Sequence, residues 1–330
     1  MINRIGLALL LPAFALLFSC ENDLDLSGEY DETIIIYGLL DHTKDTQFVK
    51  INKSFLGDGS ALDYAQEPDS FIFENIDATL TNLSDNSVIT LQPISAPKKP
   101  GAFSDEKNIV YYTTAPLTGG RKYQLDVVNQ KSGEHAKAST VVIDTVNLTG
   151  YLGVKGSQVN LKAPSGYIPM VVSYAVKPHV YRYETELIFN YYEYPKSNFS
   201  AGINKQIHFN LGMRLASSSS DGSVSYLFDG EEFFRKVGEK VEPDPSVERE
   251  IVDMKFVVKV ASKALQQYIE VNGELDGISQ VRPDFSNIEN GYGIFSSTYE
   301  DTVSKVFSIN SAQELKQGDY TSRLGFVDNF

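Results

Sequence analysis

The chain has 330 residues, of which 42% are hydrophobic, and it carries a formal net charge of −14. The hydrophobic content is enough for a folded core, and the length predicts one large domain or two medium ones. The acidic balance argues against nucleic acid as a partner, because phosphate binding needs clustered Lys and Arg side chains. Cys20 is the only cysteine, which excludes an intramolecular disulfide and a cysteine-rich metal site.

Residues 1–19 predict a lipoprotein signal peptide, with Cys20 as the site of lipid attachment. Arg4 precedes an apolar stretch from Ile5 to Phe18, which is too short to span a bilayer comfortably. The stretch ends in Leu17–Cys20, which resembles the lipobox that lipoprotein signal peptidase cuts. An ordinary signal peptide followed by a stray cysteine is the alternative. We expect cleavage before Cys20 and an anchor of acyl chains, such as palmitate, that holds the protein to a membrane.

Residues 20–32 predict an acidic tether behind the anchor. The segment contains Asp23, Asp25 and Glu29 among turn-forming residues. Acidic residues in this place resemble the surface-export signal of Bacteroidota lipoproteins, and a plain soluble linker is the alternative.

Residues 33–145 predict an immunoglobulin-like β-sandwich, and the whole chain is expected to be mainly β. Short β-branched or alternating segments are separated by turn clusters such as 118–120 and 131–133, a spacing typical of sandwiches. The chain has no Trp and only one Cys, so the likeness is one of architecture. The expected strands cover residues 33–40, 47–53, 76–83, 87–91, 109–113, 122–129 and 135–143.

Residues 146–330 predict a second β-rich domain with a few short helices. Long strands are expected at 181–194, 203–215 and 249–260, with Ile207, Phe209, Leu211 and Met213 on one face. Helices are expected after three capping residues, Asp229, Ser262 and Ser311.

No catalytic constellation is evident, and we expect no enzyme activity, metal or cofactor. The four histidines, His42, His135, His179 and His208, are scattered in turns and strands without metal-ligand spacing. Paired carboxylates for glycoside hydrolysis cannot be recognised among 43 acidic residues. Glu184, Glu186 and Glu193 are the first that such a hypothesis would test.

The densest aromatic cluster consists of Tyr191, Tyr192, Tyr194 and Phe199. These rings are candidates for binding a glycan or a peptide, since an aromatic face can stack on a ligand. Tyr and Phe are also ordinary strand formers, and this structural interpretation is the one we favour.

Several strings in the chain resemble one Bacteroidota lipoprotein family, domain of unknown function 4249. They are Cys20 with its tether, 35–40, 47–55, 65, 69–70, 101–103, 111–112, 117–127 and, most distinctive, 286–295. In the last string, Gly291 and Gly293 predict a positive φ or a close backbone approach at the start of a strand. The resemblance implies no reaction or catalytic residue.

The resemblance implies an outer-membrane lipoprotein, often encoded near TonB-dependent transporters. We therefore expect a non-enzymatic, lipid-anchored protein, facing the cell exterior, that is accessory to such a transporter or to another outer-membrane assembly. The alternative is a surface module that binds glycans or peptides for nutrient capture. Two Asp-Thr-Val triplets, Asp144–Val146 and Asp301–Val303, fit the O-glycosylation pattern of exported Bacteroidota proteins, although so short a motif also arises by chance.

Overall fold

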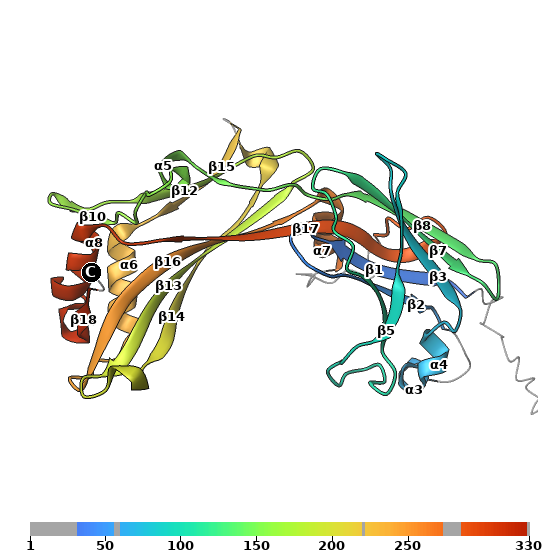
Figure 1. Ribbon diagram of the computed structural model, residues 1–330, viewed down its shortest axis with the longest axis horizontal. Helices are drawn as coiled ribbons and strands as arrows, with labels where there is room; N and C mark the ends of the chain where they lie inside the picture. The colour runs from blue at the N-terminus through green and yellow to red at the C-terminus, as the bar shows by residue number, and fades with distance from the viewer. Residues whose placement is uncertain (1–31, 56–59, 220–221, 273–284, 329–330) are drawn as a thin grey trace, which may run out of the picture.

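The structure is a computed structural model that describes residues 32–55, 60–219, 222–272 and 285–328. As expected it is mainly β, with 46% strand and 19% helix. Its largest element is a nine-stranded sheet that contains the strands β14-β13-β16-β17-β1-β2-β6-β5 in this order. Two lobes are built on this sheet, and together they form an arch (Figure 1).

The first lobe is a two-layer β-sandwich. One layer is the part of the large sheet that contains β1 (Ile34–Leu40), β2 (Gln47–Lys53), β6 (Ile109–Thr113) and β5 (Gln92–Ser95). The other layer contains β4 (Val88–Thr90), β3 (Ile76–Asn82), β7 (Lys122–Asn129) and β8 (His135–Val141). Two short helices, α3 (Ala61–Gln66) and α4 (Pro68–Phe71), follow β2.

A tyrosine corner supports the immunoglobulin-like description of this sandwich. Tyr123 lies at the start of β7, and its hydroxyl oxygen accepts a hydrogen bond from the backbone N–H of Thr118 at 3.0 Å. Immunoglobulin-like domains use such a tyrosine to fix the connection before a strand. The expected strands of this lobe are confirmed to within two residues at each end.

The second lobe packs a three-stranded sheet and helices against the other end of the large sheet. Its large-sheet strands are β13 (Arg182–Pro195), β14 (Ile203–Leu215) and β16 (Val247–Ala261), and β18 (Phe326–Val327) pairs with β16. The smaller sheet contains β15 (Ser223–Phe228), β12 (Met170–Ala175) and β9 (Leu148–Thr149). The remaining elements are α5 (Gly150–Gly153), β10 (Lys162–Ala163), β11 (Gly166–Tyr167), η2 (Phe199–Ala201), η3 (Ala216–Ser218), α6 (Gly230–Lys240), α8 (Ile309–Gln317) and η4 (Ser322–Leu324).

The strand β17 (Gly291–Lys305) connects the two lobes. Its first half pairs in parallel with β1, and its second half pairs antiparallel with β16. Ile288 and Phe295 accordingly belong to the core of the first lobe. The expected assignment of all of 146–330 to a second domain therefore needs a correction, because this late segment completes the first sandwich. Parallel pairing between such distant segments leaves no local pattern in the sequence.

The expected helices are present, but their caps differ. Asp229 caps α6 as predicted, accepting a hydrogen bond from the N–H of Glu232 at 2.9 Å. Ser262 precedes α7 (Lys263–Asn272), yet its hydroxyl contacts the hydroxyl of Ser296. The capping box expected at Ser311 is wrong by one turn, because α8 begins after Ser308 and Ser311 accepts a hydrogen bond from the N–H of Leu161.

The strand β14 has the predicted bounds, but its expected apolar face is only partly right. Ile207 and Phe209 are buried in the second core, whereas Met213 is exposed. A register shift between Thr185 and Glu186 lies opposite this part of β14, where Gly212 has a φ of +84°. Such a bulge reverses the side to which later residues point.

Candidate functional site

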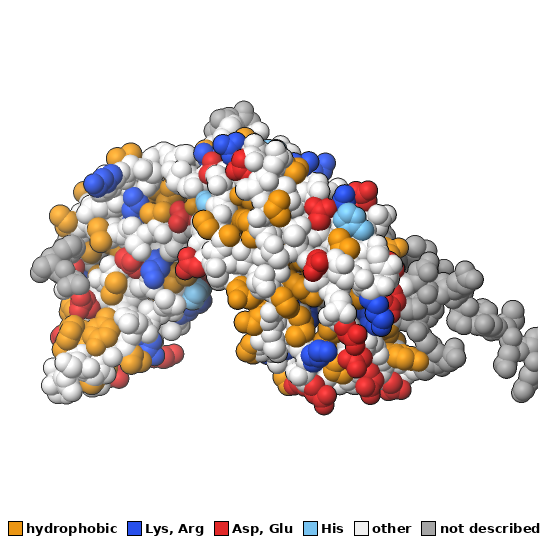
Figure 2. Space-filling view, turned by 45° about the vertical axis from the view of Figure 1, so that its right-hand side comes forward, with side chains coloured by type: hydrophobic (Ala, Val, Ile, Leu, Met, Phe, Trp, Pro, Cys, Tyr) orange, Lys and Arg blue, Asp and Glu red, His pale blue; other side chains and the backbone are white. Residues whose placement is uncertain are grey.

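The candidate site is the concave face of the arch, which is the side of the nine-stranded sheet that faces away from both cores. Alternation along β17 defines it, because Phe295 lies in the first core and Tyr299 in the second. The residues that alternate with them, such as Thr298 and Glu300, point to the opposite side of the strand. Figure 2 shows the hollow between the lobes, with hydrophobic side chains gathered on the first lobe's side of it.

On the second lobe the concave face carries rows of polar side chains across neighbouring strands. Glu184, Lys259 and Glu300 are paired in one row across β13, β16 and β17. In the following rows, His208 Nδ1 lies 2.8 Å from Glu186 Oε1, and further side chains of β14 and β13 are hydrogen-bonded to each other. These contacts hold the polar groups in fixed positions before any ligand arrives.

Three of the four aromatic residues that were candidates for ligand binding lie at one end of this polar face. Tyr192 and Tyr194 share the outward side of β13, and Phe199 of η2 packs against both, with ring centroids 5.2 and 4.6 Å away. We call these three residues the aromatic platform. The Tyr194 hydroxyl donates to Glu248, and burial together with this hydrogen bond raises the pKa of Tyr194. Tyr191 is not part of it, because its side chain is buried against Phe326 in the core.

On the first lobe the concave face is mainly apolar, although Lys50 of β2 lies beside Tyr37. Tyr37 and Leu39 of β1, Phe48 of β2 and Ile94 of β5 each expose 43–52% of their surface there. We call these four residues the apolar face. These residues were not among the predicted site residues. The unbroken apolar run of β1 (Ile34–Leu40) was a signal for them, since such runs are typical of strands covered on both sides.

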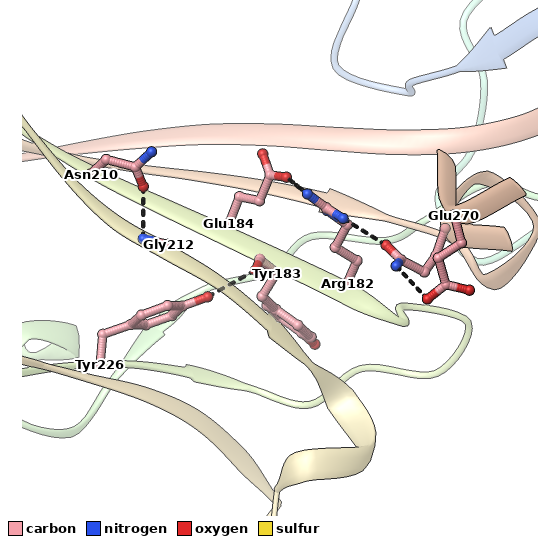
Figure 3. Close-up of polar contacts among 8 residues, drawn as sticks. Arg182, Tyr183, Glu184, Asn210, Gly212, Tyr226 and Glu270 are labelled. Atoms are coloured by element: carbon pink, nitrogen blue, oxygen red, sulfur yellow. Dashed lines mark hydrogen bonds and ion pairs between the residues drawn. The ribbon is translucent and has the colours of Figure 1, made fainter. Parts of the chain in front are cut away.

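The helix α7 packs on the concave face at the junction of the lobes. The Arg182 guanidinium donates to Glu184 through Nε at 2.7 Å and to Gln266 of α7 through Nη1 at 2.8 Å, and Gln266 donates to Glu270 (Figure 3). Tyr268 of α7 makes an edge contact with Tyr37, with centroids 6.4 Å apart. A pocket of about 270 Å³, the apex pocket, lies beside the helix.

The acidic residues that a hydrolase hypothesis would test each contact a basic side chain. Glu193 accepts a hydrogen bond from Arg249 Nε at 2.8 Å, whereas Glu184 and Glu186 bond Arg182 and His208 on the concave face. Among the described residues no group of three or more His, Asp or Glu side chains is placed to hold a metal ion.

The structure does not describe the predicted lipid anchor. Cys20 and the tether up to Asp31 lie outside the described residues. In the two Asp-Thr-Val triplets, Thr302 is exposed and Thr145 is half-buried. In the part of the chain that the structure describes, no helix is both long enough and apolar enough to cross a membrane.

Two comparisons, with family models and with curated proteins, found no match. The resemblance carried by 286–295 and the other strings therefore stays a prediction.

Proposed function

We propose that the protein is a lipid-anchored outer-membrane lipoprotein that docks a protein partner against its concave face and catalyses no reaction itself. The observation that carries the proposal is the apolar face of Tyr37, Leu39, Phe48 and Ile94. The solvent side of a sheet is normally polar, and a contiguous exposed apolar patch marks an interaction surface. The lipobox at Cys20 and the family resemblance support an outer-membrane transporter or assembly as the partner.

Site-specific crosslinking in the native membrane tests this docking role. A photoreactive amino acid at Phe48 should crosslink to an outer-membrane protein, and one at Leu227 should not. Leu227 is 70% exposed but lies on β15, outside the nine-stranded sheet. The proposal is wrong if the two positions give the same products, or if Phe48 crosslinks only to lipid. Protease treatment of intact cells tests separately whether the protein faces the exterior.

Glycan capture is the second candidate, and the aromatic platform favours it. Tyr192 and Tyr194 lie on the same side of β13 as the polar residues Glu184, Glu186 and Asn190. Rings that stack on the apolar side of a sugar, next to fixed hydrogen-bonding groups, are suited to a carbohydrate chain.

A glycan array with a matched pair of variants tests the second candidate. Binding should be lost in Tyr194→Ala and kept in Tyr151→Ala, because Tyr151 is an exposed ring on α5 in the other part of the lobe. If the wild-type protein binds no glycan, glycan capture is excluded, whereas the proposed docking role is unaffected.

A further inference from the structure

The apex pocket is lined by five parts of the chain. The β1–β2 connection contributes Asp41 and Lys44, and α7 contributes Leu265 and Ile269. Strands β13, β16 and β17 supply the rest of the lining, which includes Arg182, Glu184, Lys259, Thr298 and Glu300. A volume of about 270 Å³ lies just below the usual range for drug-sized ligands, so the pocket suits a small molecule or the end of a chain.

A hydrogen-bonded network behind the pocket holds part of its lining in place. Gln266 is only 2% exposed, and it links Arg182 to Glu270 through two hydrogen bonds of 2.8 Å. Arg182 also contacts Glu184 through both Nε and Nη2, so its guanidinium is already committed. These hydrogen bonds fix the position of α7, and they do not involve the other charged groups of the pocket.

Most of the remaining charged groups are accessible to a ligand. The nearest charged atoms of Lys259 and Glu300 are 4.0 Å apart, which makes a loose ion pair, and both side chains are half-exposed. Lys44 forms no ion pair within the described ranges, and Asp41 is 5% exposed with one oxygen accepting hydrogen bonds from Thr43. Lys44, Lys259 and Glu300 are therefore the charged groups that a ligand can reach without breaking a tight pair, whereas the buried Asp41 adds a negative charge to the wall.

The lining charges balance, and one wall is apolar. Three cations, Lys44, Arg182 and Lys259, face three carboxylates, Asp41, Glu184 and Glu300, in a chain whose net charge is −14. Such a pocket favours neither a simple anion nor a simple cation, but it complements a ligand that carries both charges. Leu265 and Ile269, four residues apart on α7, add a surface for an apolar side chain.

The aromatic ring in the described lining does not offer a ligand a face on which to stack. Tyr299 is the only aromatic residue of the described lining, and its ring is stacked on His42 with centroids 5.5 Å apart. Burial and the nearby Asp301 raise the pKa of Tyr299 to about 12, so it stays neutral at physiological pH. The pocket thus differs in chemistry from the aromatic platform at the far end of β13.

We propose that the apex pocket binds a zwitterion with an apolar side chain, that is, a free amino acid or a short peptide. The carboxylate of the ligand lies toward Lys44 and Lys259, its ammonium group toward Asp41 and Glu300, and its side chain against Leu265 and Ile269. This inference does not depend on the docking role, because it concerns a different part of the concave face.

Calorimetry on the full chain in mild detergent tests the inference with four probes: leucine, the dipeptide Ala-Leu, its N-acetylated form and its C-terminal amide. Either leucine or Ala-Leu should bind, and each capped form should bind at least tenfold more weakly. Whichever of the two uncapped probes binds more tightly reports the spacing of the charges. The inference is overturned if no probe binds, or if a capped form binds as tightly as the free dipeptide.

Two variants localise the binding. Lys259→Met should weaken it at least tenfold, whereas Lys122→Met, an exposed lysine on β7 of the other sheet, should leave it unchanged. Equal affinity in both variants excludes the apex pocket. Crosslinking from Phe48 in the Lys259→Met background should be unchanged, so failure of this inference is distinguishable from failure of the docking role.

Discussion

Gly293 lies so close to Ile36 that a β-carbon on Gly293 would be 2.0 Å from the Ile36 carbonyl oxygen. Gly293 also has a φ of +110°, which side chains other than hydrogen rarely tolerate. The contact lies where β17 begins its parallel pairing with β1. We expect Gly293→Ala to lower the free energy of unfolding by roughly 3 kcal/mol or more, from combined clash and backbone strain.

Urea denaturation of two glycine variants checks this expectation. Gly101→Ala is the control, because a β-carbon there meets nothing within 4 Å, and it should change the free energy by less than about 0.5 kcal/mol. If Gly293→Ala unfolds at the same urea concentration as the control, the close contact with Ile36 does not require glycine at position 293.

Local patterns predicted much of the fold. The strand pattern of 203–215 gave both ends of β14, and the paired glycines of 286–295 indicated a close backbone approach that Gly291 and Gly293 both make. The strands were predictable because alternation reports burial on one side of a sheet. The shared sheet was not, since β1 and β17 pair across more than 250 residues.

Tertiary contacts decided the features that local patterns could not. Ser308 and Ser311 are both reasonable caps for α8, and the bond from Leu161 to Ser311 places the latter inside the helix. Likewise Tyr191 and Tyr192 are neighbours of the same type, but only the register of β13 turns one to the core and the other to the surface. The candidate site depends on that register.

Arg249 is a buried cation whose charge is balanced by Glu193. Arg249 is 3% exposed and bonds Glu193 Oε2 at 2.8 Å and two backbone carbonyls. Glu193→Gln leaves the guanidinium uncompensated, so we expect a loss of roughly 3 kcal/mol in the free energy of unfolding. The matched control is Glu239→Gln, which removes the exposed i,i+4 pair with Arg235 and should cost less than about 0.5 kcal/mol. Chemical denaturation at neutral pH compares them, and similar losses would contradict the burial argument.

The tyrosine corner of the first lobe depends on a single hydroxyl. In Tyr123→Phe the N–H of Thr118 loses its acceptor while the ring keeps its packing. We expect thermal and urea unfolding to report a loss of about 1–2 kcal/mol. Tyr151→Phe, which removes a longer and exposed contact to Gln158, should stay within about 0.5 kcal/mol of the wild type. A neutral result for Tyr123→Phe means that the connection before β7 is held by packing alone.

Lys50 is a titratable group within the apolar surroundings of the first lobe. Its Nζ donates to Asn108 Oδ1 and to the Ile109 carbonyl, each at 2.8 Å. Burial, and secondly the positive charge of Lys98, lower the pKa of Lys50 from 10.5 to about 8. Lysine-selective ¹³C NMR should show one resonance that titrates near this value, assigned by its loss in Lys50→Met.

The same shift predicts the sign of a pH effect on stability. Below pH 8 both folded and unfolded chains hold the Lys50 proton, and the folded state bears the full cost of burying the charge. Between about pH 8 and 10.5 only the unfolded state still binds it, so the free energy of unfolding rises with pH in this window. The wild type should therefore gain stability relative to Lys50→Met between pH 7 and pH 9.5 in urea denaturation. A constant difference between the two proteins would mean that Lys50 remains solvated and keeps an ordinary pKa.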